Sequence, residues 1–410
     1  MTASDSALDL LNSGHIAESI PPLREAALCD PSYKSFLNYG IALRYSGDFT
    51  NALIWLAKAV CLDTRPPNAF LALGNVSTEL GEWDHALGYY ESAFYRVSHQ
   101  QSGADAIRQV AIAYASALMR AHRFSEAWPL WELGRFNRSY FALPGTQQWL
   151  GQPCDSLLVV CEGGYGDAML YGRWLPLLHT RARYVSLLIW DRMTDFRSWK
   201  LLGVDEVISQ STEMEAANTQ YTTSWMSLPA IFGMKSVADI PPDDALRNAY
   251  DMKSERIGYC WRAEENLTLR PVRSLDDDSA QSLADALANY GEVTSLAPSK
   301  LALYTTKGFV IPSGILQDES LIAGWRVTAQ TIRSCKLVVT VDTAVAHLAG
   351  LCGVPTLILL PCNSDQKWGT ADNQPTDPWY GAHVHYYRNA DPHKWNVEEI
   401  ASCAASTITS

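Results

Sequence analysis

A short segment recurs at a fixed spacing in the first third of the chain. Residues 47–52 read Gly-Asp-Phe-Thr-Asn-Ala, and residues 81–86 read Gly-Glu-Trp-Asp-His-Ala, a period of 34 from Gly47 to Gly81. Weaker copies begin at Gly14 and His122. A period of this length is typical of helical hairpins that stack into a solenoid, because a single hairpin cannot bury its apolar side alone.

Helical spacing of apolar residues flanks each copy. Leu37 and Ile41 precede the second turn, and Ala52, Leu56 and Ala59 follow it at intervals of three or four. We therefore expect helical repeats over residues 1–140. A stack of this kind has a concave face, which fits a groove for a protein partner or an acceptor. A packing or homodimerisation scaffold is the alternative.

The pattern changes after a segment with Pro and Gly turns, residues 141–154, which we expect to be a linker. Apolar strand-like runs then alternate with helical segments, which predicts parallel sheets with crossover helices. The expected fold is α + α/β: a helical solenoid followed by two Rossmann-type lobes, residues 155–247 and 248–410. Two such lobes in series predict a ligand cleft between them. The expected strands are 156–161, 184–190, 256–261, 292–296, 336–341 and 356–360, and the expected helices are 168–179, 280–290 and 343–352.

Charge and cysteine usage narrow the class of protein. The formal net charge of -12 makes the chain a poor non-specific binder of nucleic acid or anionic membrane. No apolar run approaches the roughly 20 residues of a membrane helix. The nine cysteines are scattered without a Cys-x-x-Cys pair, so we expect reduced core thiols in a cytoplasmic protein and no zinc site.

A glycine-rich turn follows the first expected strand of the first lobe. It reads Gly163-Gly164-Tyr165-Gly166-Asp167 and precedes a helix. Gly164 and Gly166 allow the backbone to approach a ligand, and a helix start favours anions. The spacing is not that of a dinucleotide fingerprint, so it gives little support to NAD binding. Asp167 is either a plain helix cap or a general base at the mouth of the cleft.

A second strand-to-helix junction lies in the last third, at Asp342 and Thr343. We expect the backbone N–H groups of Thr343, Ala344 and Val345 to face the cleft with the positive helix end behind them, an arrangement that suits a diphosphate. His347 lies one turn further, on the Thr343 face. A packing histidine is the alternative for that residue.

Basic and aromatic residues accompany these junctions. Arg262, Arg270 and Arg273, together with Ser274, lie in or beside one loop and fit phosphate recognition. Ion pairs with nearby acids, among them residues 276–278, are the alternative. The aromatic residues that follow the last strand are candidates for the wall of a sugar or base site, with core packing equally plausible: Trp368 and Trp379.

Taken in order along nearly the whole chain, these motifs resemble the heptosyltransferase-like glycosyltransferases of the two-lobed B fold (glycosyltransferase family 9). The resemblance is greatest to the bacterial subset with N-terminal tetratricopeptide repeats. It implies that Asp167 is the base that deprotonates the acceptor, and that Arg270, Arg273 and Ser274 lie near the donor phosphates. The donor-binding motif of the family matches Asp342, Thr343, Ala344 and His347, although the family usually has Gly at 344 and often Lys near 262.

The resemblance also implies partners and cofactors. Such enzymes take a nucleotide-sugar donor and need neither metal nor other cofactor, and the acidic run at 276–278 is expected to cap a helix. We expect the acceptor to be a protein or a glycan, held by the repeats, in a bacterial or phage protein. Three alternatives stay open: a non-catalytic scaffold with a degenerate transferase region, glycosylation of a modified nucleic-acid base, and a two-lobed sugar epimerase.

Overall fold

The computed structural model divides the chain into two compact units. One comprises Met1–Phe136 with Asp365–Lys367, and the other Asn137–Ser364 with Trp368–Ser410. We call them the helical unit and the sheet unit. The structure describes residues 3–100, 102–135, 146–194, 199–210, 219–242, 255–263, 273–297, 321–369, 376–377, 379–389 and 394–409.

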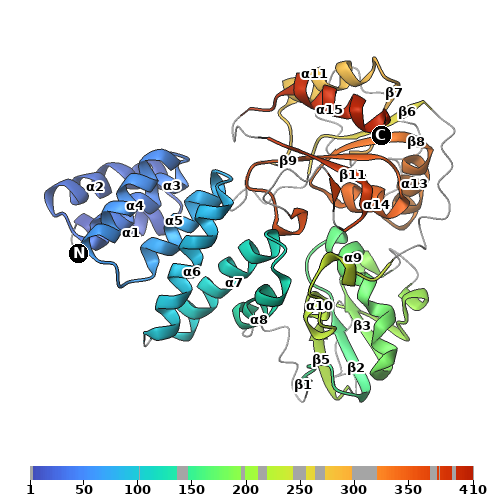
Figure 1. Ribbon diagram of the computed structural model, residues 1–410, viewed down its shortest axis with the longest axis horizontal. Helices are drawn as coiled ribbons and strands as arrows, with labels where there is room; N and C mark the ends of the chain where they lie inside the picture. Colours follow the sequence, from blue (N-terminus) through green and yellow to red (C-terminus); the bar gives the residue numbers. More distant parts are fainter. Residues whose placement is uncertain are drawn as a thin grey trace. The chain divides into compact units, whose positions relative to one another are not determined.

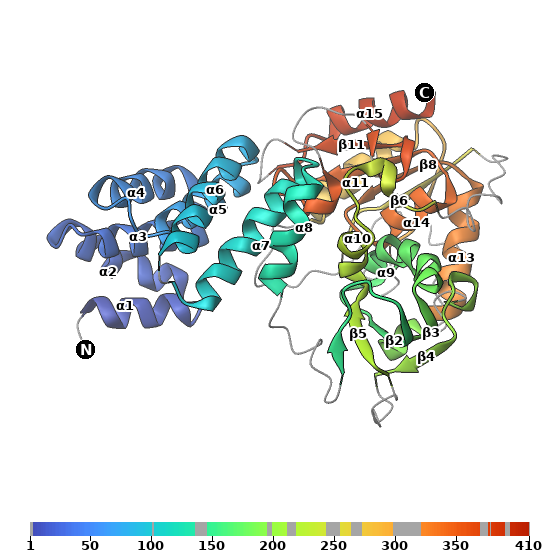
Figure 2. The same cartoon turned by 60° about the horizontal axis from the view of Figure 1, so that its bottom comes forward.

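The helical unit consists of consecutive helices in which each packs against the next one along the chain. Figure 2 shows the first members stacked as antiparallel pairs. Buried small residues such as Ala52, Ala59 and Ala86 let neighbouring helices approach closely. The helices are α1 (Ala3–Asn12), α2 (Ile16–Cys29), α3 (Tyr33–Tyr45), α4 (Phe49–Leu62), α5 (Asn68–Glu79), α6 (Trp83–His99), α7 (Ala104–Arg120) and α8 (Phe124–Arg135).

The turns of the four sequence copies share one backbone conformation. Gly14, Gly47 and Gly81 have φ values of 83°, 83° and 74°, and His122 has φ 55° at the equivalent place in the fourth turn. Residues that carry a side chain rarely adopt this left-handed backbone conformation, which explains why three of the copies have glycine there. The fourth turn therefore keeps the same geometry with a histidine.

The first lobe of the sheet unit contains a parallel sheet in the order β1-β5-β2-β3-β4. Residues 147–154, which we expected in a linker, belong partly to this sheet, because β1 pairs with β5 and Trp149 is fully buried. The strands are β1 (Gln147–Gln148), β2 (Cys154–Val160), β3 (Ala182–Ile189), β4 (Glu206–Ser209) and β5 (Tyr221–Ser224).

A short helix, α9 (Tyr165–Tyr171), follows β2 and continues as the 3-10 helix η2 (Gly172–Thr180). The helix expected at 168–179 thus starts earlier and changes to a 3-10 helix at Gly172. The other helical segments of this lobe are η3 (Asp191–Met193), η4 (Trp199–Leu202), η5 (Trp225–Ser227), α10 (Leu228–Ile231) and η6 (Val237–Asp239).

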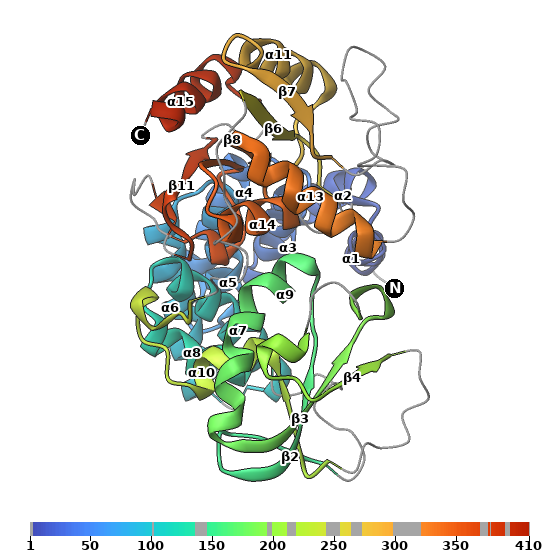
Figure 3. The same cartoon turned by 90° about the vertical axis from the view of Figure 1, so that its right-hand side faces the viewer.

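The second lobe has a sheet in the order β10-β11-β9-β8-β6-β7, parallel except for β10. Figure 1 shows α11 and α15 on one face of this sheet and α13 and α14 on the other, and Figure 3 shows the second pair side by side. The elements are β6 (Arg256–Cys260), α11 (Asp277–Leu287), β7 (Glu292–Ser295), α13 (Leu321–Ser334), β8 (Cys335–Val341), α14 (Ala344–Cys352), β9 (Thr356–Leu360), β10 (Thr376–Asp377), β11 (Gly381–Arg388) and α15 (Val397–Thr409). The 3-10 helix η8 (Gln366–Trp368) lies between β9 and β10 in the sequence, and only Trp368 of it belongs to the sheet unit.

The cysteines differ in burial, and three of those in the sheet unit are partly buried: Cys154, Cys362 and Cys403. Cys161, Cys260, Cys335 and Cys352 are buried in the sheet unit, as expected for core thiols. The two cysteines of the helical unit, Cys29 and Cys61, are exposed, and the expectation of core positions is wrong for them.

Over the ranges that the structure describes, no helix is both long enough and apolar enough to cross a membrane.

Candidate active site

The glycine-rich turn after β2 is held by its own aspartate. Asp167 is the third residue of α9, and its Oδ2 accepts a hydrogen bond from the Gly164 N–H over 2.9 Å. Gly163 has φ 78°, and a methyl group there would collide with the Asp167 carboxylate. The carboxylate is half-buried. Asp167 therefore closes the turn from within the helix and does not occupy the cap position itself.

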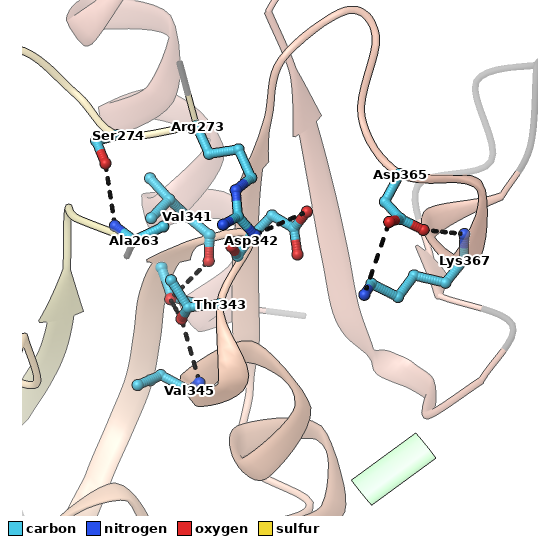
Figure 4. A network of polar contacts seen from close by, with 10 residues as sticks. Ala263, Arg273, Ser274, Val341, Asp342, Thr343, Val345, Asp365 and Lys367 are labelled. Carbon is cyan, nitrogen blue, oxygen red and sulfur yellow. Dashed lines mark hydrogen bonds and ion pairs between the residues drawn. The ribbon is translucent and has the colours of Figure 1, made fainter. Parts of the chain in front are cut away.

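The start of α14 is capped by Thr343. This residue is extended, with φ -143° and ψ 174°, and its Oγ1 accepts a hydrogen bond from the Val345 N–H over 3.1 Å. Figure 4 shows this bond at the end of β8. We expected the Val345 N–H to face a ligand together with those of Thr343 and Ala344. The threonine cap takes that donor, so Val345 is removed from the expected set.

Arg273 lies beside this helix start. Its Nη1 donates a hydrogen bond to the Asp342 carbonyl oxygen over 3.1 Å and lies 3.8 Å from the Asp342 carboxylate, as Figure 4 shows. Asp342 is 2% exposed, so the guanidinium compensates a carboxylate that is almost removed from water. Ser274 accepts a hydrogen bond from the Ala263 N–H over 3.0 Å and fixes the chain next to Arg273. The structure thus brings Arg273, Ser274, Asp342 and Thr343 together.

The other two arginines of this group are placed differently. Arg262 donates to Asp277 in the first turn of α11, the contact that the ion-pair alternative predicts. Asp276 caps α11 by accepting from the Ser279 N–H over 2.8 Å, as expected for this acidic run. Arg270 lies outside the described residues.

His347 lies in a buried contact between the two lobes. It is 1% exposed, and its Nδ1 is 2.6 Å from the Tyr380 hydroxyl oxygen. Its ring stacks on Trp368 with a centroid distance of 4.5 Å. A Cβ built at Gly166 would lie 2.6 Å from the His347 Cδ2, so the glycine permits this contact. These contacts match the packing alternative for His347.

The two tryptophans considered as a sugar or base wall are also buried. Trp368 is fully buried, and Trp379 is 7% exposed with its ring 6.4 Å from that of Trp174. A stacking wall needs an open ring face, and neither indole has one. Both residues therefore pack in the core, the alternative that the sequence left open.

Sequence reasoning missed two buried charged residues near this contact. Arg173 in η2 is 8% exposed and donates to the backbone oxygens of Pro241 and Trp379 over 2.8 and 2.7 Å. Asp377 is 2% exposed and accepts from the Tyr386 hydroxyl and from the backbone N–H groups of Trp379 and Tyr380. Burial raises the pKa of Asp377 to about 6, while these hydrogen bonds and the Arg173 charge act in the opposite direction.

A separate cavity of about 650 Å³ lies at the N-terminal ends of α11 and α15. Asp278, Glu398 and Glu399 contribute acids to its lining against one basic residue, Lys394, which makes it unfavourable for a diphosphate. Within the described ranges, no three His, Cys, Asp or Glu side chains gather in a way that would hold a metal ion.

No protein-family model matches the sequence, and no curated protein matches it. Among solved structures, the chain is similar to E. coli ADP-heptose LPS heptosyltransferase II, with 13% identity, 62% of this chain and 98% of that chain covered, and a TM-score of 0.38. It is similar to a family 9 glycosyl transferase from Veillonella parvula, with 11% identity, coverage of 63% and 98%, and a TM-score of 0.42. An O-GlcNAc transferase mutant from Thermobaculum terrenum gives 13% identity, coverage of 99% and 88%, and a TM-score of 0.35.

Proposed function

We propose that the protein is a glycosyltransferase of the two-lobed B type, which moves a sugar from a nucleotide-sugar donor to an acceptor hydroxyl. The observation that carries the proposal is the packing of α9 against α14. This contact brings the helix that bears Asp167 to the helix that Thr343 caps, beside Arg273. This packing supports the proposal, in which a carboxylate serves as base and a nearby helix start holds the anionic leaving group.

The donor diphosphate is assigned to the start of α14. The N–H groups of Thr343 and Ala344, the positive helix end and the Arg273 guanidinium would stabilise the charge that develops on the leaving diphosphate. In this proposal Asp342 holds Arg273 in place through the 3.1 Å bond to its carbonyl oxygen. No metal is required, because the positive groups of the chain serve the same purpose.

Asp167 is assigned as the general base. It would accept the proton of the acceptor hydroxyl while that oxygen bonds to the anomeric carbon and the bond from this carbon to the diphosphate oxygen breaks. The hydrogen bond from Gly164 orients the carboxylate for this step. Positioned bases of this kind contribute roughly 10²–10⁴-fold to rate.

A panel of nucleotide sugars with adenine, uracil, guanine, cytosine and thymine bases tests the proposal by thermal shift and by release of the nucleotide. We expect Asp167→Asn to bind the donor normally and to lose about 100-fold or more in turnover. Arg273→Met should instead lose donor binding. Absence of a shift and of turnover with every nucleotide sugar would contradict the proposal.

The helical unit is assigned to acceptor recognition. Four turns that each have a residue with left-handed backbone at the equivalent position support tetratricopeptide-type hairpins: Gly14, Gly47, Gly81 and His122. The acceptor would be a protein segment or a glycan, in a cytoplasmic protein of bacterial or phage origin. A pull-down with residues 1–135 fused to a carrier, compared with the full chain, tests whether this unit holds the acceptor. The alternative, homodimerisation through the same helices, would appear as a doubled molecular mass in light scattering.

A further inference from the structure

Arg173 joins three segments that are far apart in the sequence. Its Nε donates to the Pro241 oxygen over 2.8 Å, and one Nη donates to the Trp379 oxygen over 2.7 Å. The side chain belongs to η2 of the first lobe, while Trp379 follows β10 of the second lobe. Arginine is rarely buried unless its donors are satisfied, so an 8% exposed arginine in this position implies a specific structural use.

Tyr380 extends the contact from Arg173 to α14. The Arg173 guanidinium carbon lies 5.8 Å from the centre of the Tyr380 ring, and the Tyr380 N–H donates to Asp377 over 2.8 Å. At its other end, the Tyr380 hydroxyl is 2.6 Å from the His347 Nδ1. A Cβ built at Gly350 would lie 2.5 Å from the Tyr380 ring, so this ring also packs directly on α14.

His347 in turn packs against the first lobe. Its ring edge lies against Gly166, the residue before Asp167, at a separation that leaves no space for a methyl group. A second aromatic contact, between Tyr165 and Trp325 at 5.0 Å, joins α9 to α13 beside it. The second lobe thus contacts α9 at Tyr165 and Gly166, and contacts the first turn of η2 at Arg173.

We propose that Arg173 is a positioning residue that, with Tyr380 and His347, fastens α9 and η2 to α14 and so sets the position of Asp167 relative to the Thr343 helix start. The fastening of the lobes is independent of the reaction. The role that it gives to Asp167 rests on the glycosyltransferase function proposed above.

Hydrogen–deuterium exchange on the full-length protein without substrate tests the fastening. Arg173→Met keeps the length of the side chain and removes its donors, and Tyr380→Phe removes the hydroxyl bonded to His347. We expect each variant to increase exchange by about 10-fold in α9 and α14 with β2 and β8 unchanged, because local opening leaves the strands protected. Arg173→Lys should fall between wild type and Arg173→Met.

Arg183→Met is the matched control, because Arg183 is an 86% exposed residue of β3 whose ion pair with Asp155 spans 3.2 Å at the surface. It should leave exchange unchanged. Unchanged exchange in α9 and α14 of Arg173→Met, or an equal increase in the strands, overturns the proposal. The same local increase in Arg183→Met overturns it too.

Steady-state kinetics test the consequence for Asp167. We expect Arg173→Met to lower kcat by about 10- to 100-fold with the donor KM within about twofold, since a displaced base slows the transfer more than it weakens donor binding. A proportional rise in the donor KM with unchanged kcat overturns the positioning role. A wild-type protein without turnover contradicts the proposed function instead, and the exchange experiment then decides the fastening alone.

Discussion

The Oγ1 of Thr343 lies 3.1 Å from the backbone nitrogen of Val345, so the strand that ends at Val341 passes into α14 through a side-chain cap. This bond satisfies one of the donors that a helix start leaves without an intrahelical partner. It also leaves the preceding N–H groups as those assigned to the diphosphate. The stability of the cap and the binding of the donor are therefore linked at one residue.

We expect Thr343→Ala to lower the free energy of unfolding of the sheet unit by about 1 kcal/mol, the usual cost of a lost helix cap. Thr343→Ser keeps the hydroxyl and should stay within about 0.5 kcal/mol of wild type. Urea unfolding followed by tryptophan fluorescence measures both. Equal losses in the two variants would show that the methyl group, and not the cap, is what stabilises the junction.

The glycine-rich turn offers a matched pair of substitutions. A Cβ at Gly166 would lie 2.6 Å from the His347 ring, whereas a Cβ at Gly164 would have no atom within 4 Å. We expect Gly166→Ala to destabilise the sheet unit by about 1–3 kcal/mol through overpacking, and Gly164→Ala to change stability by less than about 0.5 kcal/mol. Thermal denaturation measures both, and a stable Gly166→Ala protein would contradict the buried contact.

The pH dependence of the helical unit should contain a contribution from His122. Burial lowers the pKa of this imidazole below its usual value, so between the two pKa values the unfolded chain binds more protons than the folded one. The contribution to stability is fully present above about pH 6.5, the unfolded pKa. It is lost as the pH falls from there through the lower pKa of the folded state.

His122→Asn tests this contribution, because asparagine tolerates the left-handed backbone without titrating in this range. As the pH decreases from 7 to 5, we expect the wild type to lose more unfolding free energy than the variant does. A difference that stays constant over this interval would assign the acid sensitivity to other groups.

Cysteine reactivity should follow burial. Burial raises the pKa of Cys260 and Cys352 to about 11 and that of Cys335 to about 12, so at pH 8 these thiols are neither ionised nor accessible. Cys29 and Cys61 are exposed and should react with a disulfide reagent before the three buried thiols. Mass mapping after timed labelling in native buffer checks the order, and early labelling of Cys260 would contradict the packing of β6.

The central strands could be predicted closely from sequence because they are buried on both sides. The run at 356–360 is fully apolar after its first residue, and the strand has those bounds; the run at 336–341 begins one residue late. Helix positions were less exact after β2, where the segment expected as one α-helix is the short helix α9 followed by the 3-10 helix η2. Residues 147–148 join a sheet through pairing with residues 221–222, which local pattern does not reveal.

The candidate site was predictable only where it follows a strand end. Thr343 and Asp167 are marked by the junction of strand and helix, a local signal. Arg173 carries no such signal, because its partner Trp379 is 206 residues away. The role of His347 was also decided at a distance, by the space that Gly166 leaves against its ring.

The histidine in the fourth hairpin turn bears on how such arrays are counted. His122 adopts the left-handed backbone conformation that glycine has in the other three turns, so this turn geometry does not require glycine. One hairpin turn of an array can therefore lack the consensus glycine and keep the same backbone geometry. Repeat number in related chains is better counted from the left-handed residue at each turn than from glycine in the sequence.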